Sequence, residues 1–275
     1  AANSNVRQNA LHLLLDIFPL EDPDATKEDK DTLLGKQFFL LERLLVDDCP
    51  EVRTIAIEGS CRVLHLFWEV IPSPIITKML TKIIGDMSHD ACNEVRLSTL
   101  NGIIYLLDNP HSHEVLKVLC PRLGHLMQDN VLTVRVAVAD LLLRLNDVRN
   151  FQFNKVRVFL NSPLFKKFLY LIDQPPVAQK ITKLLIPSYF PSTVPIEEAC
   201  NRCIRLVKRA PMAGAIFCKY AVLEGASKTH LMELVKVFLS LVLSPDQLDA
   251  GQIEGFLVAA SFLCDNLACE PCYMN

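Results

Sequence analysis

The sequence predicts an all-α protein built as an α-solenoid, in which helix pairs stack one on the next along the chain. Three observations support this fold class. A Val-Arg phrase returns every 39 to 46 residues, apolar residues after each phrase follow the period of an α-helix, and glycine is sparse, with 9 in 275 residues. Because 51% of the residues are hydrophobic, such helices have ample apolar surface to bury.

The repeated phrase marks the period. Val-Arg begins at Val6, Val52, Val95 and Val134, and Val177 in "DQPPVAQKITKLL" offers a fifth position. The intervals of 46, 43, 39 and 43 residues lie in or at the edge of the range of about 40–47 residues found for two-helix HEAT or armadillo repeats. We therefore expect about six stacked two-helix units of the HEAT type, each completing its core against its neighbours.

A helix is expected after each of these valines. The residues four, seven, eight and eleven positions further on share one face of an α-helix, and they are mostly apolar or small. In three of the units they are Ala10, Leu13, Leu14, Ile17; Ala56, Gly59, Ser60, Val63; and Val138, Leu141, Leu142, Leu145. The small residues among them are expected to let packed helices approach closely.

An amphipathic helix is also expected before each phrase, at residues 32–48, 74–87 and 113–129. Prolines fall mostly at helix starts and in turns, where the missing N–H group costs little. Pro121 is different, because it lies inside the segment 113–129 and predicts a kink there. The acidic stretch 21–31 is expected to form a long, mobile connection.

The expected domain organisation is a single solenoid over residues 1–275, a fragment of a longer protein, since the chain starts inside a repeat-like phrase. Regular repeats are expected over residues 3–190. Residues 155–172 fit the period least well, because Pro163 falls in what should be a helix. Residues 191–275 are more divergent, with helices expected at 195–209, 212–224, 228–243 and 246–268.

Aspartate and arginine recur at equivalent points of successive repeats. Each Asp precedes a turn and each Arg enters the next helix, so a ladder of hydrogen-bonded Asp–Arg pairs is expected along the solenoid. The expected members are Arg53, Arg96, Arg135, Asp48, Asp90 and Asp129. We interpret them as inter-repeat structure, and contact between the arginines and a ligand is the alternative.

The formal charge of −3 hides a basic segment in the middle of the chain. Residues 155–209 hold ten Lys and Arg against three acidic residues, a net charge of +7, between two acidic segments. Within it, Arg202, Arg205 and Arg209 follow one stripe of an expected helix, with Lys208 at its edge. Such a stripe is typical of contact with DNA phosphates without sequence specificity, and a solvated helix face is the alternative interpretation.

Enzymatic and metal-dependent functions find little support. The chain contains no G-x-S-x-G, H-E-x-x-H or G-x-x-x-x-G-K-[ST] motif, so we expect no enzyme, no cofactor and no small-molecule substrate. Cys-x-x-Cys units at Cys200/Cys203 and Cys269/Cys272 could together bind zinc, but Cys269 follows Cys203 by 66 positions, whereas about 15–20 residues usually separate such halves. We expect buried or idle thiols and no metal; a zinc-dependent regulator is the alternative.

The chain also lacks the signals of secretion and membrane insertion. Its first residues have no basic start followed by a cleavable apolar stretch, and no run of 18 uncharged apolar residues occurs, so no membrane span is expected. Ten cysteines without a secretory signal predict reduced thiols in the nucleus or cytosol.

Five stretches carry a more specific likeness: "VRQNALHLLLDIFPLEDPD", "EVRTIAIEGSCRVLHLFWEVIP", "EVRLSTLNGIIYLLDNPHSHEVL", "TVRVAVADLLLRL" and "EEACNRCIRLVKRAPMAGAIFCKYA". They resemble the G-type HEAT-repeat, non-SMC subunits of condensin II. The resemblance covers most of residues 3–225, and residues 155–172 depart from it.

This resemblance implies a non-catalytic scaffold that binds the kleisin subunit of condensin II, an SMC-containing complex. It further implies a contribution to sequence-nonspecific binding of double-stranded DNA in mitotic chromosome assembly, and a location in the nucleus on chromosomes. Kleisin segments are expected to bind through a few apolar anchors in grooves between repeats. HEAT scaffolds of another class, such as nuclear transport receptors or phosphatase scaffolds, are the alternative and need no DNA.

Overall fold

The computed structural model describes residues 3–148, 174–191, 194–244 and 248–268. The chain forms two compact units, residues 1–159 and 160–275. The described residues of both units contain α-helices and short 3-10 segments and no strand, which confirms the expected all-α class of helical repeats. None of the helices in these ranges combines the length and apolarity needed to cross a bilayer.

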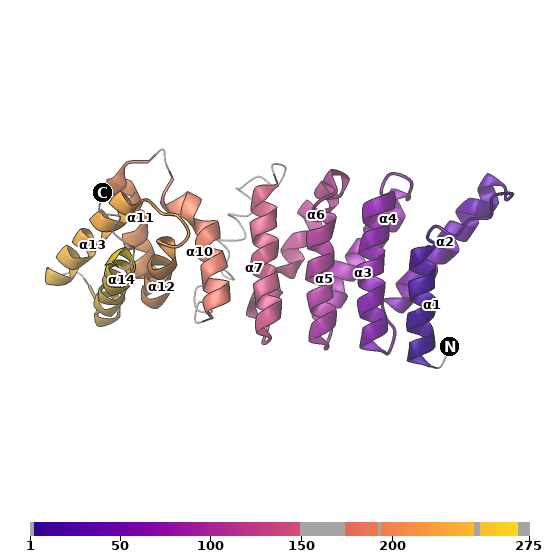
Figure 1. Ribbon diagram of the computed structural model, residues 1–275, viewed down its shortest axis with the longest axis horizontal. Helices are drawn as coiled ribbons and strands as arrows, with labels where there is room; N and C mark the ends of the chain where they lie inside the picture. Colours follow the sequence, from indigo (N-terminus) through magenta and orange to yellow (C-terminus); the bar gives the residue numbers. More distant parts are fainter. Residues whose placement is uncertain (1–2, 149–173, 192–193, 245–247, 269–275) are drawn as a thin grey trace, which may run out of the picture. The chain divides into compact units, whose positions relative to one another are not determined.

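Unit 1 is a stack of helices in two rows. Its α-helices are α1 (Ser4–Asp16), α2 (Lys27–Leu44), α3 (Pro50–Phe67), α4 (Ser73–Gly85), α5 (Asn93–Leu106), α6 (His113–Leu119) and α7 (Leu132–Asp147). Helices α1, α3, α5 and α7 lie side by side, each packed on the next (Figure 1). Helix α4 packs against α6 in the second row, and α2 packs on α3. Contacts of α3 with both α2 and α4 join the two rows.

Close approach within the first row depends on glycine. A Cβ on Gly102 of α5 would lie 2.6 Å from the sulfur of Cys61 in α3, and a Cβ on Gly59 of α3 would lie 2.2 Å from a methyl group of Leu15 in α1. Both glycines belong to the face that the repeat pattern marks as small. Since neither position has room for a side chain, these two residues set the distance between neighbouring helices.

The first helix departs from the predicted pattern. Leu13 and Ile17, expected on the packed face, are 67% and 55% exposed, whereas Leu11 and Leu15 are 1% and 7% exposed. The reason is that α1 packs on α3, and the residues turned toward α3 are Leu11 and Leu15. The equivalent face of α3, α5 and α7 is buried because another first-row helix precedes each of them.

Two local predictions were wrong in detail. Helix α2 begins at Lys27, inside the acidic stretch that was expected to be a mobile connection, because the Thr26 hydroxyl accepts a hydrogen bond from the N–H of Asp29 and caps the helix. Pro121 does not kink one long helix. Helix α6 ends at Leu119, and the 3-10 segment Cys120–Gln128 (η3) follows, since proline cannot donate the next α-helical hydrogen bond.

Unit 2 contains α10 (Pro175–Tyr189), α11 (Ile196–Arg209), α12 (Pro211–Ala221), α13 (Lys228–Leu243) and α14 (Ala250–Ala268). Helices α10, α12 and α14 pack in one row, and α11 packs against α13 in the other. Phe217, Phe238 and Phe256 are fully buried between them. The bounds of α11 to α14 lie close to the four helices expected in the divergent part. The irregular segment 155–172 lies outside the described residues.

Gly255 in α14 offers a test of close helix contact in unit 2. A Cβ there would lie 2.8 Å from the backbone Cα of Pro211 in α12. We expect Gly255→Ala to destabilise the protein by about 1–3 kcal/mol through overpacking, although alanine normally favours a helix. The measurement is the free energy of unfolding in urea, followed by circular dichroism.

Gly251 in the same helix is the matched control, because its nearest neighbour would be the Asp249 carboxylate at 3.4 Å. Gly251→Ala should leave stability unchanged or raise it by up to about 1 kcal/mol. Equal effects of the two substitutions would contradict the contact between α14 and α12.

Candidate functional site

The polar centre of unit 1 is a series of Arg–Asp pairs that join successive repeats, which we call the ladder. Each pair is bidentate, with Nε and Nη2 of the arginine donating to the two oxygens of one carboxylate. The pairs are Arg7–Asp47 at 2.7 and 2.7 Å, Arg53–Asp90 at 2.7 and 2.8 Å, and Arg96–Asp129 at 2.6 and 2.9 Å. Two parallel charge-assisted bonds fix both the distance and the orientation of neighbouring repeats.

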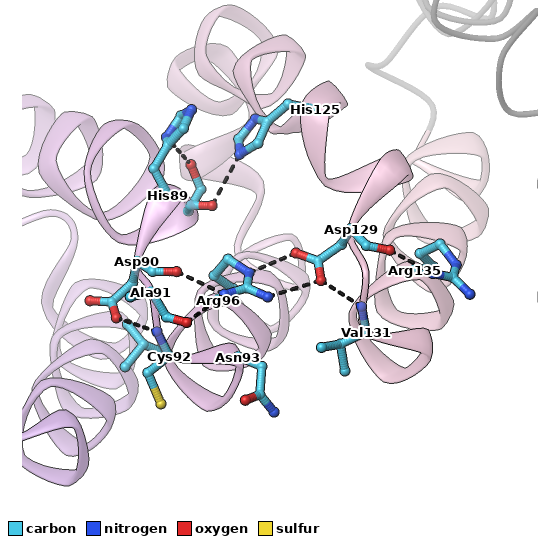
Figure 2. A network of polar contacts seen from close by, with 12 residues as sticks. His89, Asp90, Ala91, Cys92, Asn93, Arg96, His125, Asp129, Val131 and Arg135 are labelled. Atoms are coloured by element: carbon cyan, nitrogen blue, oxygen red, sulfur yellow. Dashed lines mark hydrogen bonds and ion pairs between the residues drawn. The ribbon is translucent and has the colours of Figure 1, made fainter.

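Arg53 and Arg96 also bind their own repeats. Nη1 of Arg96 donates to the carbonyl oxygens of Asp90 and Ala91, at 2.8 and 3.2 Å, as Figure 2 shows. Each aspartate in turn accepts from the backbone N–H two residues further on, so that Asp129 receives the Val131 N–H at 2.9 Å. One carboxylate therefore holds the start of a helix and the arginine of the preceding repeat together.

One aspartate of the expected ladder was wrong, and one arginine was missed. Asp47, not Asp48, pairs with an arginine, while Asp48 contributes its backbone carbonyl oxygen to Arg53 at 3.2 Å. The spacing in the sequence could have identified Asp47. The ladder aspartates Asp47, Asp90 and Asp129 each lie five positions before the repeated Val, whereas Asp48 lies four positions before it. The missed partner of Asp47 is Arg7, which carries the first Val-Arg phrase.

Pairing in the ladder lowers the pKa values of two of its aspartates, Asp129 and Asp47. Burial of the Asp129 carboxyl raises its pKa, but the hydrogen bonds from Arg96 and from the Val131 N–H outweigh burial, and the net pKa is lower than usual. The pKa of Asp47 is lowered in the same way, with Arg7 and the Cys49 N–H as donors. The Asp47 and Asp129 carboxylates are therefore ionised at neutral pH, and all three donor nitrogens of Arg96 are engaged. This arrangement favours inter-repeat structure over ligand contact for the ladder arginines.

Arg135 ends the ladder in the part of the chain that the structure describes. Its Nη1 donates to the carbonyl oxygen of Asp129 at 2.6 Å, as in the other repeats. Its Nε is buried and has no hydrogen-bond partner among the described residues. Arg135 thus keeps the contact to its own repeat and shows no carboxylate partner in these ranges.

The predicted basic stripe lies on α11, where all four cations are present and accessible to some degree. Arg202 and Arg205 both donate to Glu198, at 3.1 and 3.0 Å, and Arg202 also donates to the carbonyl oxygen of Ser188 at 2.7 Å. These bonds, first that of Arg202, lower the pKa of Glu198. Lys208 and Arg209 have no such partner among the described residues. Four cations against one carboxylate leave this face of α11 with an excess of positive charge.

The cysteines of the zinc hypothesis are only partly described. Cys200 and Cys203 are buried in α11, and burial raises the pKa of the Cys203 thiol well above its usual value. Burial likewise raises the pKa of Cys218 to about 12. Zinc binds thiolates, so such an environment disfavours metal ligation. Cys269 and Cys272 lie outside the described residues, which contain no group of three or more potential metal ligands.

Comparison with known proteins shows one set of relatives. The condensin-2 complex subunit G2 of Xenopus laevis is 37% identical over 237 residues, and that of Mus musculus is 34% identical over 239 residues. The subunit from Homo sapiens is also 34% identical. These matches cover 86% of the chain and 20% of each relative, so the chain spans about a fifth of their length.

The other comparisons add little. No family model matches the chain. Among solved structures, an engineered protein aligns over 83% of this chain and 97% of its own at 11% identity, with a TM-score of 0.44, a likeness too weak to carry an argument.

The contribution of the ladder can be measured at Asp129. Asp129→Asn keeps the shape and an acceptor for the Val131 N–H but removes the charge opposite Arg96. Because the two side chains are only 14% and 6% exposed, we expect a loss of about 2–4 kcal/mol in the free energy of unfolding. Asp108→Asn is the control, since its pair with Arg144 is about half exposed and should contribute less than about 1 kcal/mol.

The same variant should change the response to acid. The pKa of Asp129 is lowered by folding, so its stabilising effect is complete above the ordinary value of 3.8 and is lost as the pH falls through the lower folded value. Urea unfolding at neutral pH and at about pH 3 should therefore show a smaller acid loss in Asp129→Asn than in the unaltered chain. Parallel pH profiles would contradict an ionised pair.

Proposed function

Since the chain is homologous to about one fifth of a condensin-2 complex subunit G2, we propose that it is a scaffold segment of a condensin II complex. The observation that carries this proposal is the identity of 34–37% across 82–86% of the chain. The segment acts without catalysis, by holding other subunits of an SMC-containing complex, in the nucleus and on chromosomes, during mitotic chromosome assembly.

The fold supports a scaffold role. A stack of helix pairs offers a long surface with grooves between repeats, and extended partner segments bind such surfaces through a few apolar anchors. The kleisin subunit of condensin II is the partner that we propose. The ladder supports this role indirectly, because its bidentate pairs keep the repeats of unit 1 in fixed register under a bound segment.

Contact with double-stranded DNA is the second part of the proposal. The basic stripe of α11 supports it, since Arg205 and Arg209 are exposed and Lys208 is half-buried at their edge. Arg205 is held by Glu198 in an exposed pair, and a phosphate can compete for it at little cost. Lysine and arginine at these positions contact phosphates of any sequence, which gives affinity without specificity.

Assembly with the kleisin tests the scaffold proposal. We expect the 275-residue chain, coexpressed with the condensin II kleisin of the same organism, to elute with it in size-exclusion chromatography, with a dissociation constant below about 1 μM. A phosphatase catalytic subunit and a nuclear import cargo serve as controls for the other classes of HEAT scaffold. Capture of either control, with no kleisin, would contradict the assignment.

Charge reversal tests the DNA contact. The double variant Arg205→Glu, Lys208→Glu should bind random duplex DNA at least about tenfold more weakly at low salt. The slope of log affinity against log salt should fall by about 0.9 for each phosphate that the variant no longer touches. Fluorescence anisotropy with labelled DNA measures both quantities.

The control for this variant is Lys27→Glu, Lys36→Glu on α2, whose side chains are exposed and whose substitution changes the net charge equally. It should retain most of the affinity. An equal loss in the two double variants would show that only the total charge matters and would remove α11 from the site.

A further inference from the structure

Helices α11 and α13 of unit 2 leave an open groove of about 810 Å³ between them. It is lined from α11 by Ile196, Glu197, Cys200, Asn201 and Ile204, and from α13 by Thr229, Met232, Glu233, Lys236 and Val237. The stripe residues Arg202, Arg205, Lys208 and Arg209 are absent from this lining. The arginines lie on another face of α11, whereas Lys208 follows Ile204 by four positions and lies one turn beyond the groove on the same side.

The groove presents apolar side chains to solvent. Met232 is 56% and Ile196 is 39% exposed, and Ile204 and Val237 are half-buried beside them. Methionine is unbranched and adapts its shape to different apolar partners, which is why it is frequent at binding surfaces. Covering these side chains would remove apolar area from water and would favour association.

The corresponding groove of unit 1, between α2 and α4, is smaller and is bridged by an ion pair. Its volume is about 230 Å³, and Lys78 of α4 bridges it to Glu42 of α2 at 2.7 Å. No hydrogen bond or ion pair crosses from α11 to α13 among the residues that line the larger groove, all of which the structure describes. The α11–α13 groove therefore has room for a partner that the α2–α4 groove lacks.

The dimensions and chemistry of the groove favour a helix as the occupant. The lining residues run over nine positions of each helix, about 12 Å, which is the length of two to three turns. An extended segment would need partners for its backbone N–H and C=O groups, and both walls of the groove are α-helices, which offer no strand edge for it to pair with. A helix satisfies its backbone internally and can place one apolar face into a groove.

The charges on the rim of the groove indicate which charge the partner helix should carry on its polar side. Glu233 already binds Lys236 of its own helix at 3.0 Å. It also lies near Cys200, and after burial it is the second cause that raises the pKa of that thiol. Glu197 is exposed and has no partner among the described residues. Two carboxylates against one ammonium leave an acidic rim, which a basic side chain would complement.

We propose that the α11–α13 groove binds a short amphipathic helix of a partner protein, with apolar side chains against Ile204 and Met232 and a basic side chain against Glu197. This site goes beyond the proposed kleisin and DNA contacts, since it depends on neither. It requires only a partner helix whose apolar face is flanked by Lys or Arg.

A synthetic helix provides the probe. The peptide has about 14 residues, leucines spaced to form one face, arginines beside that face and alanine or glutamine elsewhere, with a fluorescent label. A scrambled peptide of equal composition has no apolar face, and a third peptide replaces each arginine by glutamate. Fluorescence anisotropy with the complete 275-residue chain measures their dissociation constants.

Met232→Glu should weaken binding of the arginine peptide by at least about tenfold. Met212→Glu, at a similarly exposed methionine outside the groove (50% against 56%), should change it less than about twofold. Glu197→Lys should weaken the arginine peptide and strengthen the glutamate peptide. Because all three residues are exposed, the variants should keep the circular dichroism spectrum and unfolding temperature of the unaltered chain.

Several results would overturn the proposal: no binding of the arginine peptide at about 1 mM, equal binding of the scrambled peptide, or equal losses from Met232→Glu and Met212→Glu. Dimerisation of the chain that Met232→Glu abolishes would also overturn it, because the groove would then hold a second copy. None of these outcomes depends on kleisin or DNA binding, so the proposed function stands or falls separately.

Discussion

The structure of unit 1 depends on one contact, the bidentate pair between an arginine at the fourth position of a first-row helix and an aspartate before the next such helix. Arg53 and Asp90 are an example. Two nitrogens of the Arg53 guanidinium donate to the Asp90 carboxylate, and the third donates to the carbonyl oxygen of Asp47 in the turn of its own repeat. The carboxylate of Asp90 accepts the Cys92 N–H at 2.9 Å as well. The start of α5 and its position against α3 are therefore set by the same side chain.

Packing of the apolar rows follows from this register. Once Arg53 and Asp90 are paired, Gly102 of α5 meets Cys61 of α3, and no larger residue would fit at that distance. Hydrophobic burial supplies most of the favourable free energy but has no direction. The planar guanidinium fork supplies the direction, because it donates two parallel hydrogen bonds to a carboxylate in one orientation. Hydrophobic burial thus provides most of the stability, and the Arg–Asp pairs fix the register of the repeats.

The sequence predicted the repeats well and their edges less well. The period and the helix phase come from residues that the repeats share. The pairing of Arg96 with Asp129 and the approximate bounds of α4 and α11 could therefore be predicted from the sequence. Asp48 and Asp47 are adjacent and chemically identical, and only their distance from the repeated Val tells them apart. The exposure of Leu13 depends on which helix lies beside α1, which is a tertiary property. The 3-10 segment after Pro121 and the cap at Thr26 reflect local hydrogen bonds that periodicity does not report.

The first-row helices of unit 2 have no arginine at the fourth position, where those of unit 1 carry the ladder arginine. This difference affects what the surface of unit 2 can bind. The fourth residue is Arg7 in α1, Arg53 in α3, Arg96 in α5 and Arg135 in α7, but it is Ala178 in α10 and Gly214 in α12. A Cβ on Gly214 would lie 2.8 Å from the Cα of Val207 in α11, so this position of α12 makes close backbone contact with α11 and carries no charged pair. Among the described residues, no arginine of unit 2 pairs with a carboxylate of another helix. Arg202 of α11 still binds the Ser188 carbonyl oxygen of α10. The side chains of Arg205, Lys208 and Arg209 show no bond to another helix among the described residues, which leaves them available for an anionic partner.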